Sequence, residues 1–255
     1  MIDIHSHILF NVDDGPGIFQ QSIDMLEAAT KEGISDIIST SHTCHPQYHV
    51  SAELVKLQVH ELQNELHRRH IPLSIHLGHE VRLCEDIINL VKEKEILSLA
   101  DSNYLLLELP SNHIPRYTKN IIHELHKIGI IPIIAHPERN KAIAQKPERL
   151  ERLIREGAAA QITAGSIVGH FGRTIQKLSM ELMKANLVHT YGSDAHHVKR
   201  RPFLFKQGLF YLEKHKLLDL VDLFMENNKR IIGNDSLIMY EPDVSSKKKR
   251  SLFTF

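Results

Sequence analysis

The segment Ile128-Gly129-Ile130-Ile131-Pro132-Ile133-Ile134-Ala135-His136 contains the pattern that decides the fold. A stretch of helical periodicity, 116–128, ends at Gly129, and glycine readily adopts the left-handed conformation that closes a helix. The short, β-branched run 130–135 then predicts a buried parallel strand. His136 follows at the carboxyl end of that strand. The chain thus passes from helix to strand to a side chain able to bind a metal ion.

This pattern recurs along the chain. Seven short apolar runs predict strands at 2–4, 34–39, 73–77, 104–109, 130–135, 159–163 and 187–191. Helical periodicity predicts helices at 23–30, 54–67, 87–94, 116–128, 147–156, 175–184, 203–214 and 217–227. Strands that alternate with helices predict an α/β fold. The most economical architecture is a distorted (β/α)7 barrel, with a doubly wound open sheet as the alternative.

Length and composition favour one domain. With 255 residues, 42% of them hydrophobic, the chain can bury one large core. We expect a single domain over residues 1–240, followed by a basic, flexible tail at 241–255 that contains Lys247-Lys248-Lys249-Arg250. The 31 basic and 31 acidic residues cancel, which argues against a nucleic-acid partner.

Targeting signals and disulfides are not expected either. No run of eighteen apolar residues occurs, so we expect no membrane insertion and a cytoplasmic protein. Cys44 and Cys84 are predicted to be free thiols. Val50 and Leu90 stand six positions after them, where a thiol-dependent phosphatase of the Cys-x5-Arg type carries arginine.

Histidine and carboxylate side chains gather at the predicted strand ends. Six of the seven strands, together with the first loop, supply such a residue, whereas the strand at 159–163 ends without an obvious one. Because the carboxyl ends of parallel strands meet on one face of a barrel, these side chains are expected to form one metal cluster. The candidate ligands are His5, His7, Asp14, His42, Glu80, Glu108, His136, Asp194 and His196.

Each of these signals has a simpler alternative when taken alone. His5-x-His7 can occur by chance, and Asp13-Asp14-Gly15 is more often a plain turn. Glu108 is more specific, because a carboxylate within Leu105-Leu106-Leu107-Glu108-Leu109 would be costly to bury without a cation. For this residue the alternative is a buried structural ion pair.

Several of the motifs together resemble a known family. Asp3-Ile4-His5-Ser6-His7, His136-Pro137-Glu138-Arg139 and Ser193-Asp194-Ala195-His196 resemble motifs of the PHP (polymerase and histidinol phosphatase) superfamily. Within it, the chain is most similar to the manganese-dependent protein-tyrosine phosphatases of capsule and exopolysaccharide loci in Gram-positive bacteria. Two departures occur: Ser6 stands where relatives often carry cysteine, and Thr40-Ser41-His42-Thr43 replaces the common Thr-Pro-His-His.

The resemblance implies up to three Mn²⁺ ions, with Fe²⁺ or Zn²⁺ as alternatives. It places His5, His7, Glu80 and Asp194 at the first ion. The second ion would be held by the bridging Glu80 with Glu108 and His136, and the third by Asp14, His42 and His196.

The implied activity is that of a protein-tyrosine phosphatase, a phosphoric monoester hydrolase. A hydroxide that bridges the ions would attack the phosphorus atom, and Arg139 and Arg201 are the candidates for holding the phosphoryl oxygens. The implied substrate is a phosphotyrosine-containing bacterial tyrosine kinase that regulates capsule or exopolysaccharide synthesis. The alternatives are a small-molecule phosphatase of the histidinol-phosphate type and a non-catalytic, metal-stabilised scaffold whose basic tail binds anionic lipid or a kinase.

Overall fold

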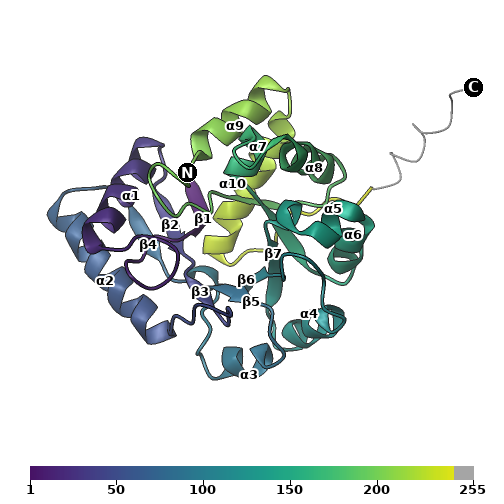
Figure 1. Cartoon of the computed structure of the whole chain (residues 1–255), viewed down its shortest axis with the longest axis horizontal. Helices are drawn as coiled ribbons and strands as arrows, with labels where there is room; N and C mark the ends of the chain where they lie inside the picture. Colours follow the sequence, from purple (N-terminus) through teal and green to yellow (C-terminus); the bar gives the residue numbers. More distant parts are fainter. Residues whose placement is uncertain (244–255) are drawn as a thin grey trace, which may run out of the picture.

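Parallel strands occupy the centre of the molecule, and helices surround them (Figure 1). The computed structural model describes residues 1–243. In this part of the chain a three-stranded sheet has the order β1-β2-β4, and a six-stranded sheet has the order β3-β5-β6-β7-β8-β9. The strands are β1 (Ile2–Ser6), β2 (Asp36–Ser39), β3 (His42–Thr43), β4 (Ser74–His76), β5 (Glu80–Arg82), β6 (Tyr104–Glu108), β7 (Ile131–Ala135), β8 (Ala159–Thr163) and β9 (Thr190–Gly192).

Two strands, β3 and β5, were not expected from the sequence. Each continues the line of a predicted strand after a short break: β3 follows β2 after Thr40-Ser41, and β5 follows β4 after 77–79. β2 pairs with β4, and β3 pairs with β5, so the same two segments contribute to both sheets. Strands of two or three residues are too short to show an alternating pattern, which is why the sequence did not reveal them.

The first and last strands also approach each other. Ser6 forms an isolated parallel bridge with Ala195. The backbone amide of Asp194 donates to the carbonyl of His5 at 2.8 Å, and that of His7 donates to Ala195 at 2.9 Å. The parallel α/β fold is therefore confirmed. Within residues 1–243 the strand ladders remain in two sheets, so they do not by themselves confirm a closed barrel.

All eight predicted helices are present. Gly33, Gly129 and Gly157 have φ of 85°, 78° and 104°, as expected of residues that end helices. One-turn elements such as α5 and α7 were missed, because they are shorter than a helical repeat pattern. The helices are α1 (Phe19–Lys31), α2 (Ala52–Arg68), α3 (Ile87–Lys92), α4 (Thr118–Lys127), α5 (Lys141–Gln145), α6 (Glu148–Arg155), α7 (Ala164–Val168), α8 (Arg173–Lys184), α9 (Phe205–Lys214) and α10 (Leu218–Gly233), with 3₁₀ turns η1 (Leu99–Asp101) and η2 (Pro137–Arg139).

Strand alternation divides the core into two clusters. On β6, Leu105 and Leu107 belong to a large cluster that includes the buried faces of the helices. Leu106 belongs to a smaller cluster made mainly of side chains from the strands of both sheets, with Ile4, Ile38, Ile133 and Ala159 among its members. Because side chains two apart share a face, Glu108 lies on the same side of β6 as Leu106, at the strand's end.

The predicted boundary between the domain, 1–240, and the tail, 241–255, lies just before the last three residues that the structure describes. Glu241 forms an ion pair with Arg155 at 2.5 Å, and the amide of Asp243 donates to the carbonyl of Ala185. The remainder of the predicted tail, 244–255, lies outside the described residues.

No helix in 1–243 combines the length and the apolar character needed to cross a membrane.

Candidate metal centre

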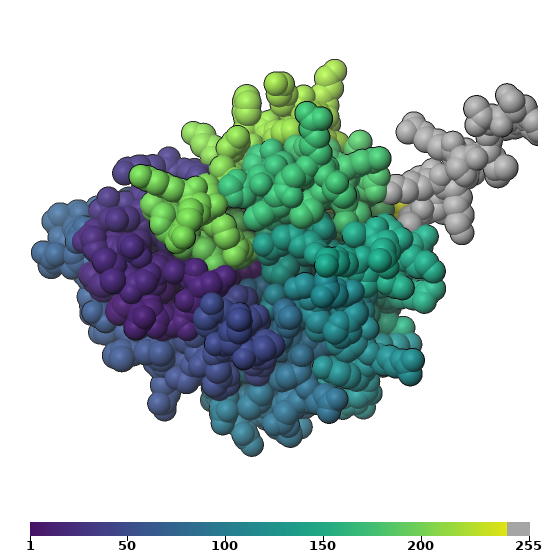
Figure 2. Space-filling view, in the orientation of Figure 1, coloured from purple at the N-terminus to yellow at the C-terminus, as the bar shows by residue number. Residues whose placement is uncertain are grey.

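The nine candidate ligands lie together at the carboxyl ends of the strands. Figure 2 shows the segments that carry them meeting on one face: the purple N-terminus, the blue segment near residue 50, the teal middle of the chain and the light-green segment near residue 200. There they surround a cavity of about 320 Å³. Asp14 has the most exposed carboxylate, at 39%, whereas the side chains of His5, His7, Glu80 and Asp194 are at most 1% exposed. All nine predicted residues are therefore brought into one site.

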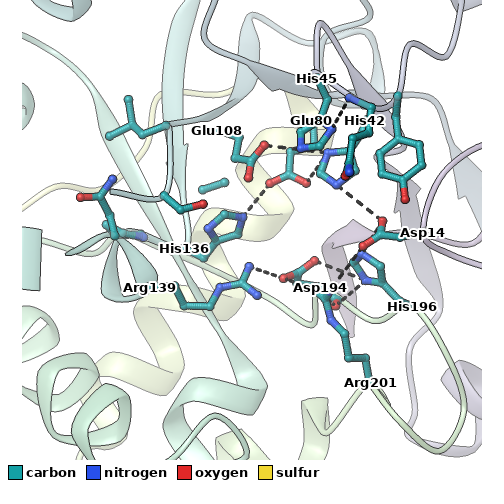
Figure 3. A pocket seen from close by; sticks show the side chains of 17 residues that line it. Asp14, His42, His45, Glu80, Glu108, His136, Arg139, Asp194, His196 and Arg201 are labelled. Carbon is teal, nitrogen blue, oxygen red and sulfur yellow. Dashed lines mark hydrogen bonds and ion pairs between the residues drawn. The ribbon is translucent and has the colours of Figure 1, made fainter. Parts of the chain in front are cut away.

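Glu80 contacts several of the other candidate ligands, and Figure 3 shows it between Glu108, His42 and His136. Its Oε2 is 3.2 Å from Nε2 of His7 and 3.2 Å from Nδ1 of His42. Its Oε1 is 2.7 Å from Nε2 of His136. Burial raises the pKa of Glu80, but the surrounding imidazoles outweigh this effect, so the pKa lies well below its ordinary value. The carboxylate is thus ionised and available to bridge two sites.

Three imidazoles are oriented by hydrogen bonds from Nδ1. In His5 this atom donates to Oε1 of Gln161 at 3.0 Å, and in His7 it donates to Oδ2 of Asp13 at 2.9 Å. In His196 it donates to the backbone carbonyl of Asp194 at 3.0 Å. Since these partners are oxygens that only accept, the hydrogen is placed on Nδ1 and Nε2 faces the cluster.

Several buried nitrogen and oxygen atoms of the cluster have no hydrogen-bond partner and are suited to bind cations. The Nε2 atoms of His5, His7 and His196 are buried without a hydrogen-bond partner. The same is true of Nδ1 of His42 and Oε2 of Glu108. Buried polar atoms normally have partners, and a histidine ligand typically donates its other ring nitrogen to an oxygen. These residues therefore meet the requirements of a metal centre with mixed nitrogen and oxygen ligands.

Asp194 connects the cluster to two arginines. Its Oδ1 is 3.3 Å from Nε2 of His5, whereas Oδ2 accepts hydrogen bonds from Arg139 and, at 2.7 Å, from Arg201. Burial raises the pKa of Asp194, but the two guanidinium groups outweigh it and hold the pKa well below its usual range. Both predicted arginines thus line the cavity, and both also position a candidate ligand.

Glu108 satisfies both interpretations of its buried position. Its Oε1 forms an ion pair with Arg82 at 2.8 Å, which is the structural pairing that the sequence left open. Its Oε2 lies 4.0 Å from Nδ1 of His42 and has no hydrogen-bond partner. Burial, and then the charge of Glu80, raise the pKa of Glu108 above its ordinary value. One oxygen is therefore fixed in place while the other remains available to a cation.

His42 and its loop form one wall of the cavity. Burial lowers the pKa of His42 to about 4, so its imidazole is neutral at pH 7 and can offer a lone pair. The rings of His45 and Tyr48 stack against it, with centroids 4.8 Å and 5.8 Å away. The backbones of His45 and Tyr48 exchange hydrogen bonds at 3.1 and 3.2 Å, which closes the loop.

Local backbone geometry places two of the candidate ligands. His136 and Asp194 have φ of 32° and 53°, in the left-handed region that residues other than glycine rarely adopt. Such strain is common where a site fixes the direction of a side chain. Gly192 is needed for a different reason, because a Cβ there would lie 2.8 Å from the Cβ of His5.

Sequence reasoning missed four residues that shape the site. In the sequence, Asp13 is only part of a common turn motif beside Asp14, and His45 does not follow a predicted strand end. Gln161 lies in the middle of β8, the strand that showed no ligand at its end, yet it orients His5. Arg82 gave no signal, because its role depends on β5 pairing with β6, where Arg82 lies opposite Glu108.

Comparison with known proteins identifies the family. Residues 1–233 match the family described as capsular polysaccharide synthesis, CpsB/CapC. The chain belongs to the CpsB/CapC family. Within the CpsB/CapC family, it is 42% identical over 251 residues to a Staphylococcus aureus protein provisionally named tyrosine-protein phosphatase CapC, covering 98% of each chain. It is 39% identical over 255 residues to tyrosine-protein phosphatase YwqE of Bacillus subtilis, covering 100% of both.

A solved structure from the CpsB/CapC family has the same fold. Its TM-score is 0.93 at 39% identity, covering 95% of this chain and 98% of the other. It comes from work on YwqE from Bacillus subtilis and CpsB from Streptococcus pneumoniae, described as unique metal-dependent tyrosine phosphatases. The family predicted from the sequence motifs is therefore confirmed.

Proposed function

We propose that this chain is a metal-dependent protein-tyrosine phosphatase that acts in capsule or exopolysaccharide synthesis. The observation that carries the proposal is the set of buried nitrogen and oxygen atoms that face one another beside Arg139 and Arg201 without hydrogen-bond partners. The names of the CpsB/CapC relatives and the description of the solved structure agree with this activity.

The ligand assignment has three parts. His5, His7, Glu80 and Asp194 would hold the first ion, and their ligand atoms lie within 4.8 Å of one another. Glu80, Glu108 and His136 would hold the second. Asp14, His42 and His196 would hold the third, and these atoms, with one from His7, also lie within 4.8 Å of one another. The donor set suits Mn²⁺, which is our choice, and would also accept Fe²⁺ or Zn²⁺.

The remaining groups act on the phosphate ester. When bound, divalent ions supply a nucleophile at neutral pH and offset phosphoryl charge. Arg139 and Arg201 lie at the cavity wall, where their N–H groups not bonded to Asp194 would bind phosphoryl oxygens. Phenol, with a pKa near 10, is a better leaving group than an aliphatic alcohol, so a tyrosyl ester requires little protonation of the departing oxygen.

Several finer features belong to the same proposal. The first is a distorted (β/α)7 barrel, in which β2 with β3, and β4 with β5, each count as one bent strand. It is supported by the bridge between Ser6 and Ala195 and by the smaller core cluster that contains Leu106. A single domain over 1–240 fits this arrangement.

Cytoplasmic location is supported by the free thiols of Cys44 and Cys84. The proposed substrate is the phosphorylated tail of a bacterial tyrosine kinase, by analogy with the family's role in capsule synthesis.

A substrate panel tests the activity. Purified protein is assayed with a phosphotyrosine peptide and with histidinol phosphate, in Mn²⁺ and after removal of metal by a chelator. We expect turnover of the phosphotyrosine peptide that the chelator abolishes and Mn²⁺ restores. Turnover of histidinol phosphate alone would instead support a small-molecule phosphatase. No turnover of either substrate by metal-loaded protein would overturn both activities.

A further inference from the structure

A second hollow of about 320 Å³ lies between α4 and α6, outside the metal centre. In Figure 1 both helices lie on the right flank of the molecule, with α4 below α6. Its apolar surface comes from Ile114, Pro115 and Leu153. Arg116, Arg149 and Arg152 also line it, and we call this site the α4–α6 groove.

The groove carries uncompensated positive charge. Its one carboxylate, Glu156, is already engaged by Lys119 at 2.6 Å and by His123 at 2.7 Å. Within residues 1–243, no carboxylate lies at ion-pair distance from the three groove arginines. Arg149 donates to the carbonyl of Ala142 at 3.0 Å, a bond that leaves its charge unneutralised. Three guanidinium groups are thus presented around an apolar floor.

The groove is held in a fixed position relative to the metal centre by the loop that follows β6. Leu109 and Ser111, at one end of this loop, line the metal-site cavity, whereas 114–116 line the groove. The side chain of Asn140 donates to the carbonyls of Pro110 and His113 at 2.8 and 3.4 Å. Asn140 directly follows Arg139 and itself lines the cavity, so the catalytic wall and this loop are bound together.

We propose that the α4–α6 groove binds a second phosphotyrosine of the same substrate polypeptide while the first occupies the metal centre. This inference rests on the proposed phosphatase activity. A phosphotyrosine side chain has an apolar ring and a doubly charged tip, which match the apolar floor and the arginines around it. A carboxylate side chain would satisfy the arginines but would leave the apolar floor unfilled. The groove therefore favours substrates that are phosphorylated at more than one tyrosine.

The test uses peptides in which only one phosphate can be hydrolysed. Each peptide carries one phosphotyrosine and one non-hydrolysable phosphonomethyl-phenylalanine. The phosphonate is placed before or after the phosphotyrosine, at spacings of about two to ten residues. These spacings sample a range of distances between the two groups, because each residue extends the chain by up to about 3.5 Å. Matched peptides carry tyrosine or glutamate at the second position. KM and kcat are compared for the wild type, for Arg116→Ala with Arg152→Ala, and for Lys177→Ala with Lys184→Ala. The lysine pair removes the same charge from α8.

We expect the phosphonate to lower KM by on the order of tenfold at a preferred spacing, as for charge-assisted hydrogen bonds. The double variant Arg116→Ala with Arg152→Ala should lose this reduction in KM, and the double variant Lys177→Ala with Lys184→Ala should keep it. Turnover of para-nitrophenyl phosphate should be unchanged in both variants.

Three results would overturn the inference. An equal advantage from glutamate would show that the groove accepts any acidic segment. An equal loss in the lysine pair would assign the effect to overall charge. Equal KM and kcat for peptides with and without the phosphonate would exclude binding in the groove and would leave the phosphatase activity intact. By contrast, no turnover of any peptide or of para-nitrophenyl phosphate would contradict the activity itself.

Discussion

Arg201 donates a 2.7 Å hydrogen bond to Asp194, a candidate metal ligand, while it also lines the cavity in which a phosphate would bind. Arg139 donates to the same carboxylate oxygen. The other oxygen of Asp194 faces His5 at 3.3 Å. Substrate binding and ligand geometry are thus linked through one carboxylate, and substitution of either arginine is expected to affect both.

Arg139→Ala should raise KM and lower kcat together, with kcat/KM falling by on the order of 10²–10³, because a phosphoryl-binding group acts in both the ground state and the transition state. Steady-state kinetics with a phosphotyrosine peptide measures both constants. Arg173→Ala, an exposed arginine at the start of α8, serves as the control and should change neither. Unchanged kcat/KM in Arg139→Ala would exclude its role in substrate binding.

Asp13→Ala should weaken metal binding by about 10–100-fold, the usual effect of removing a partner that orients a histidine ligand. The reason is the 2.9 Å hydrogen bond from Nδ1 of His7, which the alanine variant lacks. Asp13→Asn retains an acceptor oxygen and should lose less. Titration of metal-free protein with Mn²⁺, followed by activity, measures the shift. Saturating Mn²⁺ should restore most of kcat, and wild-type affinity in Asp13→Ala would disprove the orienting role.

Cys44→Ser combined with Cys84→Ser should leave turnover nearly unchanged. Both cysteines are free thiols, and neither lines the metal-site cavity. The activity and the metal content of the double variant are measured on the same preparation. Loss of turnover at normal metal content would contradict a mechanism in which no cysteine acts as nucleophile.

His189 should make the protein less stable in mild acid. Burial lowers the pKa of this histidine to about 4, below the ordinary value of 6.5. The unfolded chain therefore binds an additional proton between these values. The stability contribution is complete above pH 6.5 and is lost as pH falls toward 4, by up to about 3 kcal/mol.

His189→Asn tests this expectation. Its side-chain oxygen can replace the ring nitrogen that accepts from the amide of Ala160 at 3.1 Å. Thermal unfolding is followed from pH 7 to pH 5 for both proteins. The variant should show a shallower fall in Tm with acidity, and parallel curves would rule out a contribution from His189.

Much of this architecture could be predicted because the ligands follow strands with strong local patterns. Glu108 stood out because it ends an apolar run, and His136 because it follows a β-branched one. Arg82 and Gln161 could not be found in this way, since their roles arise only when β5 pairs with β6 and when β8 lies near β1. The bent strand pairs β2–β3 and β4–β5 likewise depend on tertiary pairing that leaves no periodic signal.

The central claim is that the cluster around Glu80 holds the metal ions on which turnover depends. Metal-free wild type and Glu80→Gln are titrated with Mn²⁺, and bound metal per chain and phosphotyrosine-peptide turnover are measured on the same samples. Turnover of the wild type should be absent without metal and rise with bound Mn²⁺, whereas Glu80→Gln should bind fewer ions and lose turnover by about 10³-fold. Full turnover by wild-type protein free of bound metal would contradict the account.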